Sequence, residues 1–165
     1  MNSKTKRVVV LIAVIVAIDQ LTKFVVDRSM PLHHSIPIIE GFFSLTYVRN
    51  TGAAFGIFAG SAEVFRRPFL ILVSIFAIGF IVVLLRRLPE TQKGLITALA
   101  FILGGAIGNL IDRGLYGEVI DFLDCYWGSY HWPAFNIADS FITIGVAITL
   151  FILIRAKDSD PFAAQ

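Results

Sequence analysis

Cysteine and charge are both scarce in this sequence of 165 residues. The single cysteine, Cys125, cannot form a disulfide within the chain, which excludes a secreted disulfide scaffold. Charged residues make up 16% of the chain, whereas an average soluble domain contains about 25%. The formal net charge of +2 is small and scattered along the chain, so we expect no nucleic acid partner.

Sequence patterns for metal or phosphate binding are missing as well. His33 and His34 are adjacent and His131 is solitary, and no spacing of His, Cys or Glu is typical of a metal site. The chain has no glycine-rich loop of the kind that surrounds a phosphate. Cys125 has no clear base beside it, and we interpret it as a small buried residue. We therefore expect neither a metal nor an organic cofactor.

Long hydrophobic runs are abundant instead. Hydrophobic residues make up 56% of the chain, and the mean hydropathy is +0.78. Four runs reach the length of about 17–25 apolar residues that a spanning helix needs: residues 8–26, 69–85, 95–111 and 137–154. The first run continues past Asp19 to Val26 without a small-residue cleavage site, so we expect a retained span rather than a cleaved signal peptide. The sequence predicts one transmembrane domain covering residues 1–165.

The basic residues predict how the spans are oriented. With both termini in the cytoplasm, the 14 lysines and arginines divide eight to six in favour of the cytoplasmic side. The cytoplasmic ones gather near the ends of the spans: Lys4, Lys6, Arg7, Arg86, Arg87, Lys93, Arg155 and Lys157. Arg66 and Arg67, near the outer end of the second span, oppose this arrangement. Because positive charge favours the cytoplasmic side, we expect cytoplasmic termini and two extracytoplasmic segments, residues 27–68 and 112–136.

Those two outer segments carry patterns typical of strands. Residues 42–49, FFSLTYVR, are mostly β-branched or aromatic and lie between Gly41 and the turn signal NTG. In the second segment, EVIDFLDCYW (residues 118–127) also favours extended structure. A sheet edge cannot face lipid. We therefore expect a small sheet outside the bilayer, at the end of a four-helix bundle.

Two aspartates are the first candidates for chemistry. Asp121 lies ten residues past Ile111, where the third span ends, and Asp139 lies in the first turn of the fourth span. Because the third span runs outward and the fourth runs inward, both carboxylates belong to the same face of the membrane. Two carboxylates close together share a proton, and aspartic proteases use such a pair to activate water and polarise a carbonyl. The alternatives are helix capping by Asn136 and Asp139, and ordinary loop charge at Asp121 and Asp124.

The first span contains a charged pair. Asp19 and Lys23 lie one turn apart in the motif DQLTK, toward the outer end of the run. A charge at the centre of a spanning helix costs about 2.5–3.5 kcal/mol on insertion scales, so it normally faces the bundle interior. Two interpretations remain open here: an i,i+4 ion pair with a structural role, or a support for a site at the outer membrane face.

The third span mixes small and polar residues in GGAIGNLIDR, residues 104–113. Gly104 and Gly108 have the small-xxx-small spacing of closely packed helices. Asn109 and Arg113 lie one turn apart on one face of the helix. They either stabilise helix packing through a structural hydrogen bond or point toward the same outer pocket as the two aspartates.

Five separated motifs together resemble the lipoprotein signal peptidase family, also called signal peptidase II. In chain order they are DQLTK (19–23), NTGAAFG (50–56), GGAIGNLIDR (104–113), VIDF (119–122) and FNIAD (135–139). They extend over most of the chain, and the four expected spans agree with the family. The resemblance implies an integral membrane fold that is mainly α-helical. Its parts are a four-helix transmembrane bundle, a small extracytoplasmic β-sheet (the cradle) and a short interfacial helix.

The resemblance also implies a function. Members are aspartyl endopeptidases of the bacterial cytoplasmic membrane, without metal or cofactor, that cleave the signal peptide from diacylglyceryl-modified prolipoproteins. The family's catalytic pair falls on Asp121 and Asp139. Its supporting polar residues fall on Asp19, Asn50, Asn109, Arg113 and Asn136. The expected partners are the prolipoprotein and membrane lipids, the expected state is a monomer, and the expected site lies at the extracytoplasmic face.

A second class of function stays open at this point. In a small non-enzymatic membrane protein, such as a transporter subunit, Asp121 and Asp139 would bind a cation and ion flux would depend on them. An intramembrane protease with aspartates inside two helices is a third class. Such proteases usually have a GxGD-like motif, and none occurs in this sequence.

Overall fold

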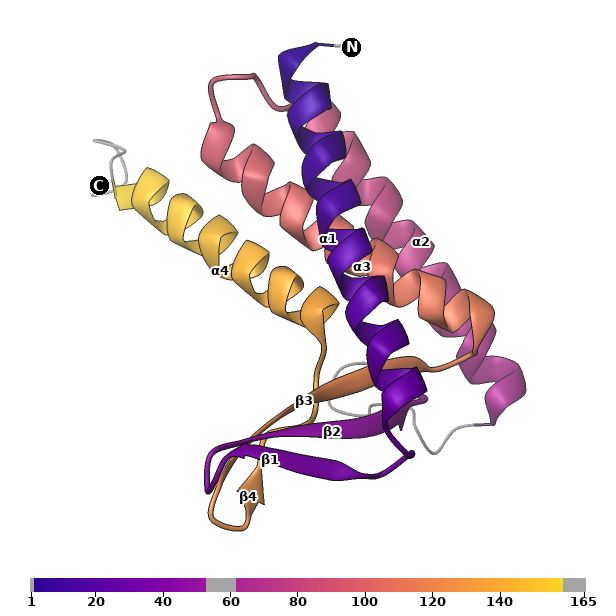
Figure 1. The fold of residues 1–165 in the computed structure, drawn as a ribbon. Coiled ribbons are helices and arrows are strands. Elements are labelled where there is room, and N and C mark those ends of the chain that lie inside the picture. Colours follow the sequence, from indigo (N-terminus) through magenta and orange to yellow (C-terminus); the bar gives the residue numbers. More distant parts are fainter. Residues whose placement is uncertain (1, 53–61, 159–165) are drawn as a thin grey trace.

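A computed structural model describes residues 2–52 and 62–158 of the chain. Within these ranges it contains four long helices: α1 (Ser3–Ser29), α2 (Glu63–Arg87), α3 (Lys93–Leu115) and α4 (Ile137–Asp158). The same ranges contain four strands: β1 (Ser35–Ile39), β2 (Phe43–Asn50), β3 (Val119–Trp127) and β4 (Tyr130–His131). The strands lie at one end of the helices, opposite the start of α1 and the end of α4 (Figure 1).

Each of the four predicted spans lies inside one helix. Among the described residues, four helices are long and apolar enough to cross a membrane: Ser3–Ser29, Glu63–Arg87, Lys93–Leu115 and Ile137–Ala156. Together with the small sheet they confirm the expected fold class. The helices run past the apolar runs, because backbone hydrogen bonding can continue where the side chains become polar. The short interfacial helix stays a prediction, since residues 53–61 lie outside the described part of the chain.

Helix α3 is the centre of the bundle. It contacts α1, α2 and α4, and half of the residues in its apolar stretch are buried, a larger share than in the other three helices. Small residues permit this close packing. A Cβ atom on Gly105 would lie 2.3 Å from the Ala138 carbonyl oxygen of α4, and one on Gly108 would lie 2.5 Å from Oδ2 of Asp19 in α1. The close packing predicted from Gly104 and Gly108 is confirmed.

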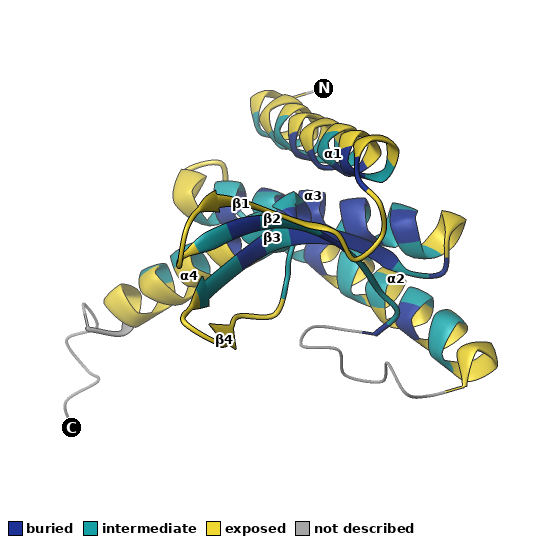
Figure 2. Ribbon diagram, turned by 60° about the horizontal axis from the view of Figure 1, so that its bottom comes forward, coloured by how far each residue is buried: buried dark blue, intermediate teal, exposed yellow. Residues whose placement is uncertain are grey.

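The strands form an antiparallel sheet in the order β1-β2-β3-β4. In the pairing of β2 with β3, Val48 lies opposite Asp121 and Asn50 lies opposite Val119. Figure 2 shows β2 and β3 half-buried to buried in the middle of the sheet, whereas β1 at its edge is exposed. Both strand segments predicted from the sequence are confirmed. The register brings the end of β2 beside the start of β3, next to the end of α3.

A small apolar cluster fixes the sheet to the end of α1. Its buried members come from α1, the residue after it, β2 and β3: Val26, Met30, Tyr47, Ile120 and Phe122. Removing these side chains from water stabilises the contact between sheet and bundle. Because successive strand residues point to opposite faces, the side chain of Asp121 points away from its neighbours Ile120 and Phe122. The packing of the sheet therefore decides which way Asp121 faces.

Candidate active site

Three elements bring polar side chains together at the sheet end of the bundle. α3 supplies Asn109, β3 supplies Asp121, and the first turn of α4 supplies Asp139. Helix α3 continues to Leu115, so Asp121 follows its end by six residues rather than the ten expected from the apolar run. Only residues 116–118 separate α3 from β3, which keeps Asp121 close to the end of α3.

Asp121 and Asp139 line one cavity of about 650 Å³. The rest of the lining combines three polar residues expected at the site with a mostly apolar wall: Asn50, Asn109, Arg113, Val119, Trp132, Pro133, Ala134, Phe135, Ser140, Ile142, Thr143 and Ile144. Asp121 itself is only 2% exposed. Asp139 is half-buried, so the two carboxyl groups share one pocket in which Asp121 is the more shielded from water.

Each of the two carboxyl groups accepts two N–H donors. Asn136 Nδ2 donates to Asp121 Oδ1 at 2.8 Å, and Asn50 Nδ2 donates to Asp121 Oδ2 at 3.0 Å. Asn109 Nδ2 donates to Asp139 Oδ1 at 2.8 Å, and the backbone N–H of Asn136 donates to Asp139 Oδ2 at 3.3 Å. These amide donors hold both carboxyl groups in place, as expected for a preorganised site.

Asn136 joins the two aspartates. It is 0% exposed, and its Nδ2 also donates to Asn109 Oδ1 at 3.1 Å and to the Ile120 carbonyl at 3.2 Å. Its Oδ1 accepts the backbone N–H of Asp139 at 2.9 Å, which caps α4. The capping interpretation is thus confirmed for Asn136 and Asp139. Capping does not compete with a site here, because the same side chain reaches Asp121.

Burial makes Asp121 a group that can carry a proton at neutral pH. Removal from water raises the pKa of its carboxyl from 3.8 to about 7, and the nearby charge of Asp139 acts in the same direction. The hydrogen bonds from Asn50 and Asn136 oppose this rise. A carboxyl group that is partly protonated near pH 7 can donate its proton to a reacting oxygen.

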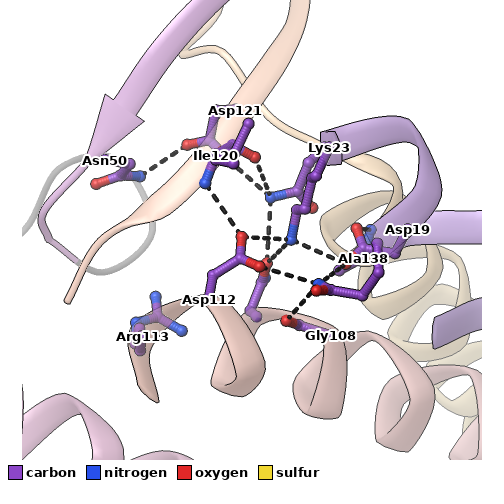
Figure 3. A network of polar contacts seen from close by, with 12 residues as sticks. Asp19, Lys23, Asn50, Gly108, Asp112, Arg113, Ile120, Asp121 and Ala138 are labelled. Atoms are coloured by element: carbon purple, nitrogen blue, oxygen red, sulfur yellow. Dashed lines mark hydrogen bonds and ion pairs between the residues drawn. The ribbon is translucent and has the colours of Figure 1, made fainter. Parts of the chain in front are cut away.

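A buried ion triad lies close to Asp121 (Figure 3). Lys23 Nζ is 2.9 Å from Asp19 Oδ2 and 2.9 Å from Asp112 Oδ2, and it donates to Asn109 Oδ1 at 3.0 Å. The three charged side chains are 0–2% exposed. The ion pair expected within DQLTK is therefore present. Its contact with Asn109 also connects it to the site.

Asp112 and Gln20 belong to this network, although the sequence analysis did not assign them to it. Gln20 Nε2 donates to Asp112 Oδ1 at 2.9 Å and to the Gly108 carbonyl at 3.2 Å. The sequence did contain an indication that Asp112 belongs to the network. An acidic residue near the end of a spanning helix needs a partner, and Lys23 in the first span was the available cation. Which lysine meets which acid depends on helix neighbours that the sequence pattern does not reveal.

Asn50 and Arg113 are linked through Gly52. Asn50 Oδ1 accepts the Gly52 N–H at 2.9 Å, and Arg113 Nη2 donates to the Gly52 carbonyl at 3.3 Å. Within the described residues, Nε of Arg113 is buried without a hydrogen-bond partner. Arg113 is also one of the residues that line the cavity. The remainder of NTGAAFG, residues 53–56, lies outside the described part of the chain.

Asp124 is not among the residues that line the cavity. Its Oδ1 is 3.0 Å from His131 Nδ1, and Thr46 Oγ1 donates to its Oδ2 at 3.3 Å. The His131 ring also stacks on Tyr126, with 4.7 Å between ring centroids. These contacts connect β4 and β2 to β3. Cys125, expected to be buried, is half-buried.

Residues 132–135 form part of the cavity wall, which the sequence patterns above did not predict. Backbone hydrogen bonds between Phe135 and Leu123, at 2.8 and 3.0 Å, hold this segment beside β3. For metal binding, no group of three or more His, Cys, Asp or Glu side chains in residues 2–52 and 62–158 is placed to hold one ion. The absence of a cofactor stays a prediction.

Solved structures of similar fold are membrane enzymes. One bacterial membrane enzyme is 30% identical to this chain, with a TM-score of 0.84 over 97% of this chain and 94% of the other. A second is 32% identical, with a TM-score of 0.79 over 91% of this chain and 94% of the other. Fold and site together define a multi-pass membrane enzyme with two carboxyl groups in one cavity.

The chain belongs to the signal peptidase II family, and it is a membrane peptidase of the aspartic type. The family described as Signal peptidase (SPase) II matches residues 11–155. The lipoprotein signal peptidase of Geobacter sulfurreducens is 54% identical over 140 residues, covering 85% of this chain and 86% of the relative. That of Geobacter metallireducens is 50% identical over 143 residues, covering 87% of each. Family membership excludes the non-enzymatic alternative that the sequence patterns left open.

Proposed function

We propose that this peptidase cleaves the signal peptide from diacylglyceryl-modified bacterial prolipoproteins, on the N-terminal side of the lipidated cysteine. The relatives named lipoprotein signal peptidase support a lipoprotein precursor as the substrate. The observation that carries the proposal is the pair of carboxyl groups, Asp121 and Asp139, that one buried asparagine joins within a single cavity. Such a pair is the chemical requirement for hydrolysis by an aspartic peptidase.

We assign the protonated role to Asp121, because its carboxyl group is the more deeply buried of the two and burial raises its pKa to about 7. A close pair of carboxyl groups holds one proton between them, so Asp139 is then the ionised partner. Asp139 accepts a proton from the attacking water molecule. Asp121 donates a hydrogen bond, and then its proton, to the oxygen of the scissile carbonyl.

Hydrolysis then proceeds in two proton-balanced steps. The water oxygen bonds to the carbonyl carbon while its proton passes to Asp139, and the carbonyl oxygen takes the proton of Asp121. In the second step the carbon–nitrogen bond breaks. The leaving nitrogen takes the proton from Asp139, and Asp121 recovers its own proton as the carbonyl re-forms. Arg113, which lines the cavity, helps to orient the bound peptide.

The position of the cavity suits a substrate that is anchored in the bilayer. A signal helix with a lipidated cysteine at its end presents the scissile bond at the outer membrane interface. The cavity lies where α4 begins, and Ile142 and Ile144 of that helix extend its apolar wall along the bundle. An apolar wall of this kind accommodates acyl chains beside the acidic residues.

The location and oligomeric state of the enzyme are part of the same proposal. We infer that it resides in the bacterial inner membrane as a monomer surrounded by lipid, with both termini in the cytoplasm. The excess of lysine and arginine at the cytoplasmic ends of the spans supports this orientation. The catalytic pair then lies at the extracytoplasmic face, where the lipidated cysteine is exposed to it.

The test is cleavage of a lipid-modified precursor by purified Asp121→Asn and Asp139→Asn variants in detergent or bilayers. Each substitution removes one participant in proton transfer and should lower turnover by at least about 100-fold, with the fold intact. Asp124→Asn is the matched control, because Asp124 lies on the same strand as Asp121 but does not line the cavity. This control should keep most of its turnover.

Two further conditions complete the test of the proposed function. An unlipidated precursor should be a poor substrate, and a chelator should leave turnover unchanged. Retained cleavage by either dyad variant would remove that residue from the mechanism. Equal cleavage of lipidated and unlipidated precursors would contradict the assigned substrate class, and loss of turnover with chelator would contradict a metal-free reaction.

A further inference from the structure

The Asp19–Lys23–Asp112 triad takes no part in the proposed chemistry, although it is more deeply buried than most of the site. Moving charges out of water is costly, and apolar residues can often replace a buried ion pair without loss of stability. Stability alone is therefore a weak reason for this arrangement. Each of its three members instead contacts a group that determines where a catalytic carboxyl group lies.

We propose that the triad is the positioning element of the catalytic pair, and that Lys23 sets the direction of the hydrogen bond that Asn109 donates to Asp139. This inference rests on the proposed function, because it assigns a role in the reaction of Asp121 and Asp139. The three triad residues do not line the cavity, so they act through other groups. Lys23 is thus a positioning residue, and it does not touch the substrate.

The two acidic members hold the backbone next to both aspartates. Asp112 Oδ2 accepts the N–H of Ile120 at 3.2 Å, and Ile120 directly precedes Asp121. Asp19 Oδ1 accepts the N–H of Ala138 at 2.9 Å, and Ala138 directly precedes Asp139. Lys23 lies between these two carboxylates at 2.9 Å from each. The triad therefore links the start of β3 to the start of α4 (Figure 3).

Lys23 also decides which way the side-chain amide of Asn109 points. An ammonium group has three donors and no acceptor, so only the oxygen of Asn109 can face it. The amide nitrogen must then point the other way, where it donates to Asp139 Oδ1 at 2.8 Å. Without Lys23, the amide can turn over and present its oxygen to Asp139, which would place two acceptors against each other.

Asn136 does not replace Lys23 in this role. Its Nδ2 carries two hydrogens but has three acceptors around it, namely Asp121 Oδ1, Asn109 Oδ1 and the Ile120 carbonyl. The contact of Asn136 with Asn109 Oδ1 is 3.1 Å long, and that of Lys23 with the same oxygen is 3.0 Å long. A hydrogen bond from a charged donor is roughly twice as strong as one from a neutral amide. The ammonium group of Lys23 is therefore the stronger of the two donors that orient Asn109.

The test is a double-mutant cycle with Lys23→Met, Asn109→Ala and the combined variant, measured as kcat and KM on the lipid-modified precursor. Lys23→Met should lower kcat by about 10–100-fold, the usual effect of removing a supporting hydrogen-bond partner, with KM nearly unchanged. The combined variant should be no slower than the slower single variant, because both changes remove the same directed hydrogen bond. Lys23→Gln, which keeps an N–H donor, should recover part of the lost kcat.

Lys4→Met is the matched control at the other end of α1. Lys4 donates to the Leu88 carbonyl at 2.6 Å, far from the cavity along the helix, so its replacement should leave kcat unchanged. If Lys23→Met does not fold, Lys23→Met combined with Asp112→Asn keeps the net charge of the triad at −1. That variant should also lose kcat, because Asn109 still lacks its ammonium partner.

Three results would overturn the inference. The first is wild-type kcat in Lys23→Met or in the charge-balanced variant. The second is a combined variant in which the effects of Lys23→Met and Asn109→Ala on kcat multiply. The third is a Lys23→Met variant that loses only in KM or in thermal stability. The Asp121→Asn and Asp139→Asn variants separate the two proposals. If those variants are inactive and Lys23→Met is fully active, only the role of the triad fails. If those variants retain turnover, the proposed function itself fails.

Discussion

Replacement of Asn136 separates its capping role from its role between the two aspartates. Asn136→Ala removes the cap on the Asp139 N–H, which costs about 1 kcal/mol. It also removes the donors to Asp121 Oδ1 and the Ile120 carbonyl, and buried acceptors without donors cost about 1–3 kcal/mol. The total expected loss in the free energy of unfolding is about 2–4 kcal/mol. Asn136→Ser keeps the cap but is too short to reach Asp121.

The two variants should therefore differ in stability but agree in turnover. We expect Asn136→Ser to be more stable than Asn136→Ala by about 1 kcal/mol, the contribution of the cap, in reversible unfolding by a denaturing detergent. Both variants should lose at least about 10-fold in kcat, because both lose the hydrogen bond that holds the carboxyl group of Asp121. The lipid-modified precursor is the substrate for both measurements of kcat.

Turnover that followed stability would refute this reasoning. If Asn136→Ser recovered both the stability and the kcat of the unmodified enzyme, capping would be the whole function of Asn136. If the two variants were equally unstable, the hydrogen bond to the Asp139 N–H would contribute nothing as a cap. A third variant, Asn136→Gln, keeps the amide but adds a methylene group in a fully buried position, and it should lose both stability and turnover.

Two further predictions concern pH and helix packing. Burial raises the pKa of Asp121 from 3.8 to about 7, so between these pH values the folded protein binds a proton that the unfolded chain lacks. The contribution of Asp121 to the free energy of unfolding is therefore greatest below pH 4. It falls by about 4 kcal/mol as the pH rises toward 7. Asp121→Asn should flatten the measured dependence of unfolding free energy on pH, and parallel curves would contradict the assignment. Gly105→Ala should lower both stability and kcat, because its Cβ would lie 2.3 Å from the Ala138 carbonyl, whereas Gly79→Ala, with no atom within 4 Å, should lower neither. Equal effects of the two alanines would contradict a close contact between α3 and α4.

The four spans could be predicted because a segment enters lipid on account of its own hydrophobicity, almost independently of how the helices pack against one another. The run 95–111 lies within α3, for example. The end of this helix could not be predicted, because α3 continues past the apolar run through Asp112 and Arg113 to Leu115. There the charge of Asp112 is compensated by Lys23 of another helix. The strand segments were also predictable, since β-branched and aromatic residues between turn signals favour extended structure.

The location of Asp121 and Asp139 on the same side of the membrane could be predicted from the topology. Counting spans placed the end of α3 and the start of α4 on the same face, whatever the details of packing. The pairing of Asp112 with Lys23 was not accessible in this way, because it depends on α1 lying against α3. The cavity wall at residues 132–135 depends on a bridge between Leu123 and Phe135, which left no periodic pattern in the sequence.

The amino-acid sequence alone determined the number of spans, the strand content and the face on which the two acidic residues meet, because hydrophobicity and alternation act along the chain. Only the tertiary structure decided how the carboxyl groups are held, because those contacts join side chains that are distant in sequence. Asn136 contacts Asp121 because the start of α4 lies beside β3. Lys23 contacts Asn109 because Gly108, which has no side chain, allows α1 to lie close to α3. The direction of a hydrogen bond depends on which groups are close in space. Local sequence patterns do not reveal these groups when they are far apart along the chain.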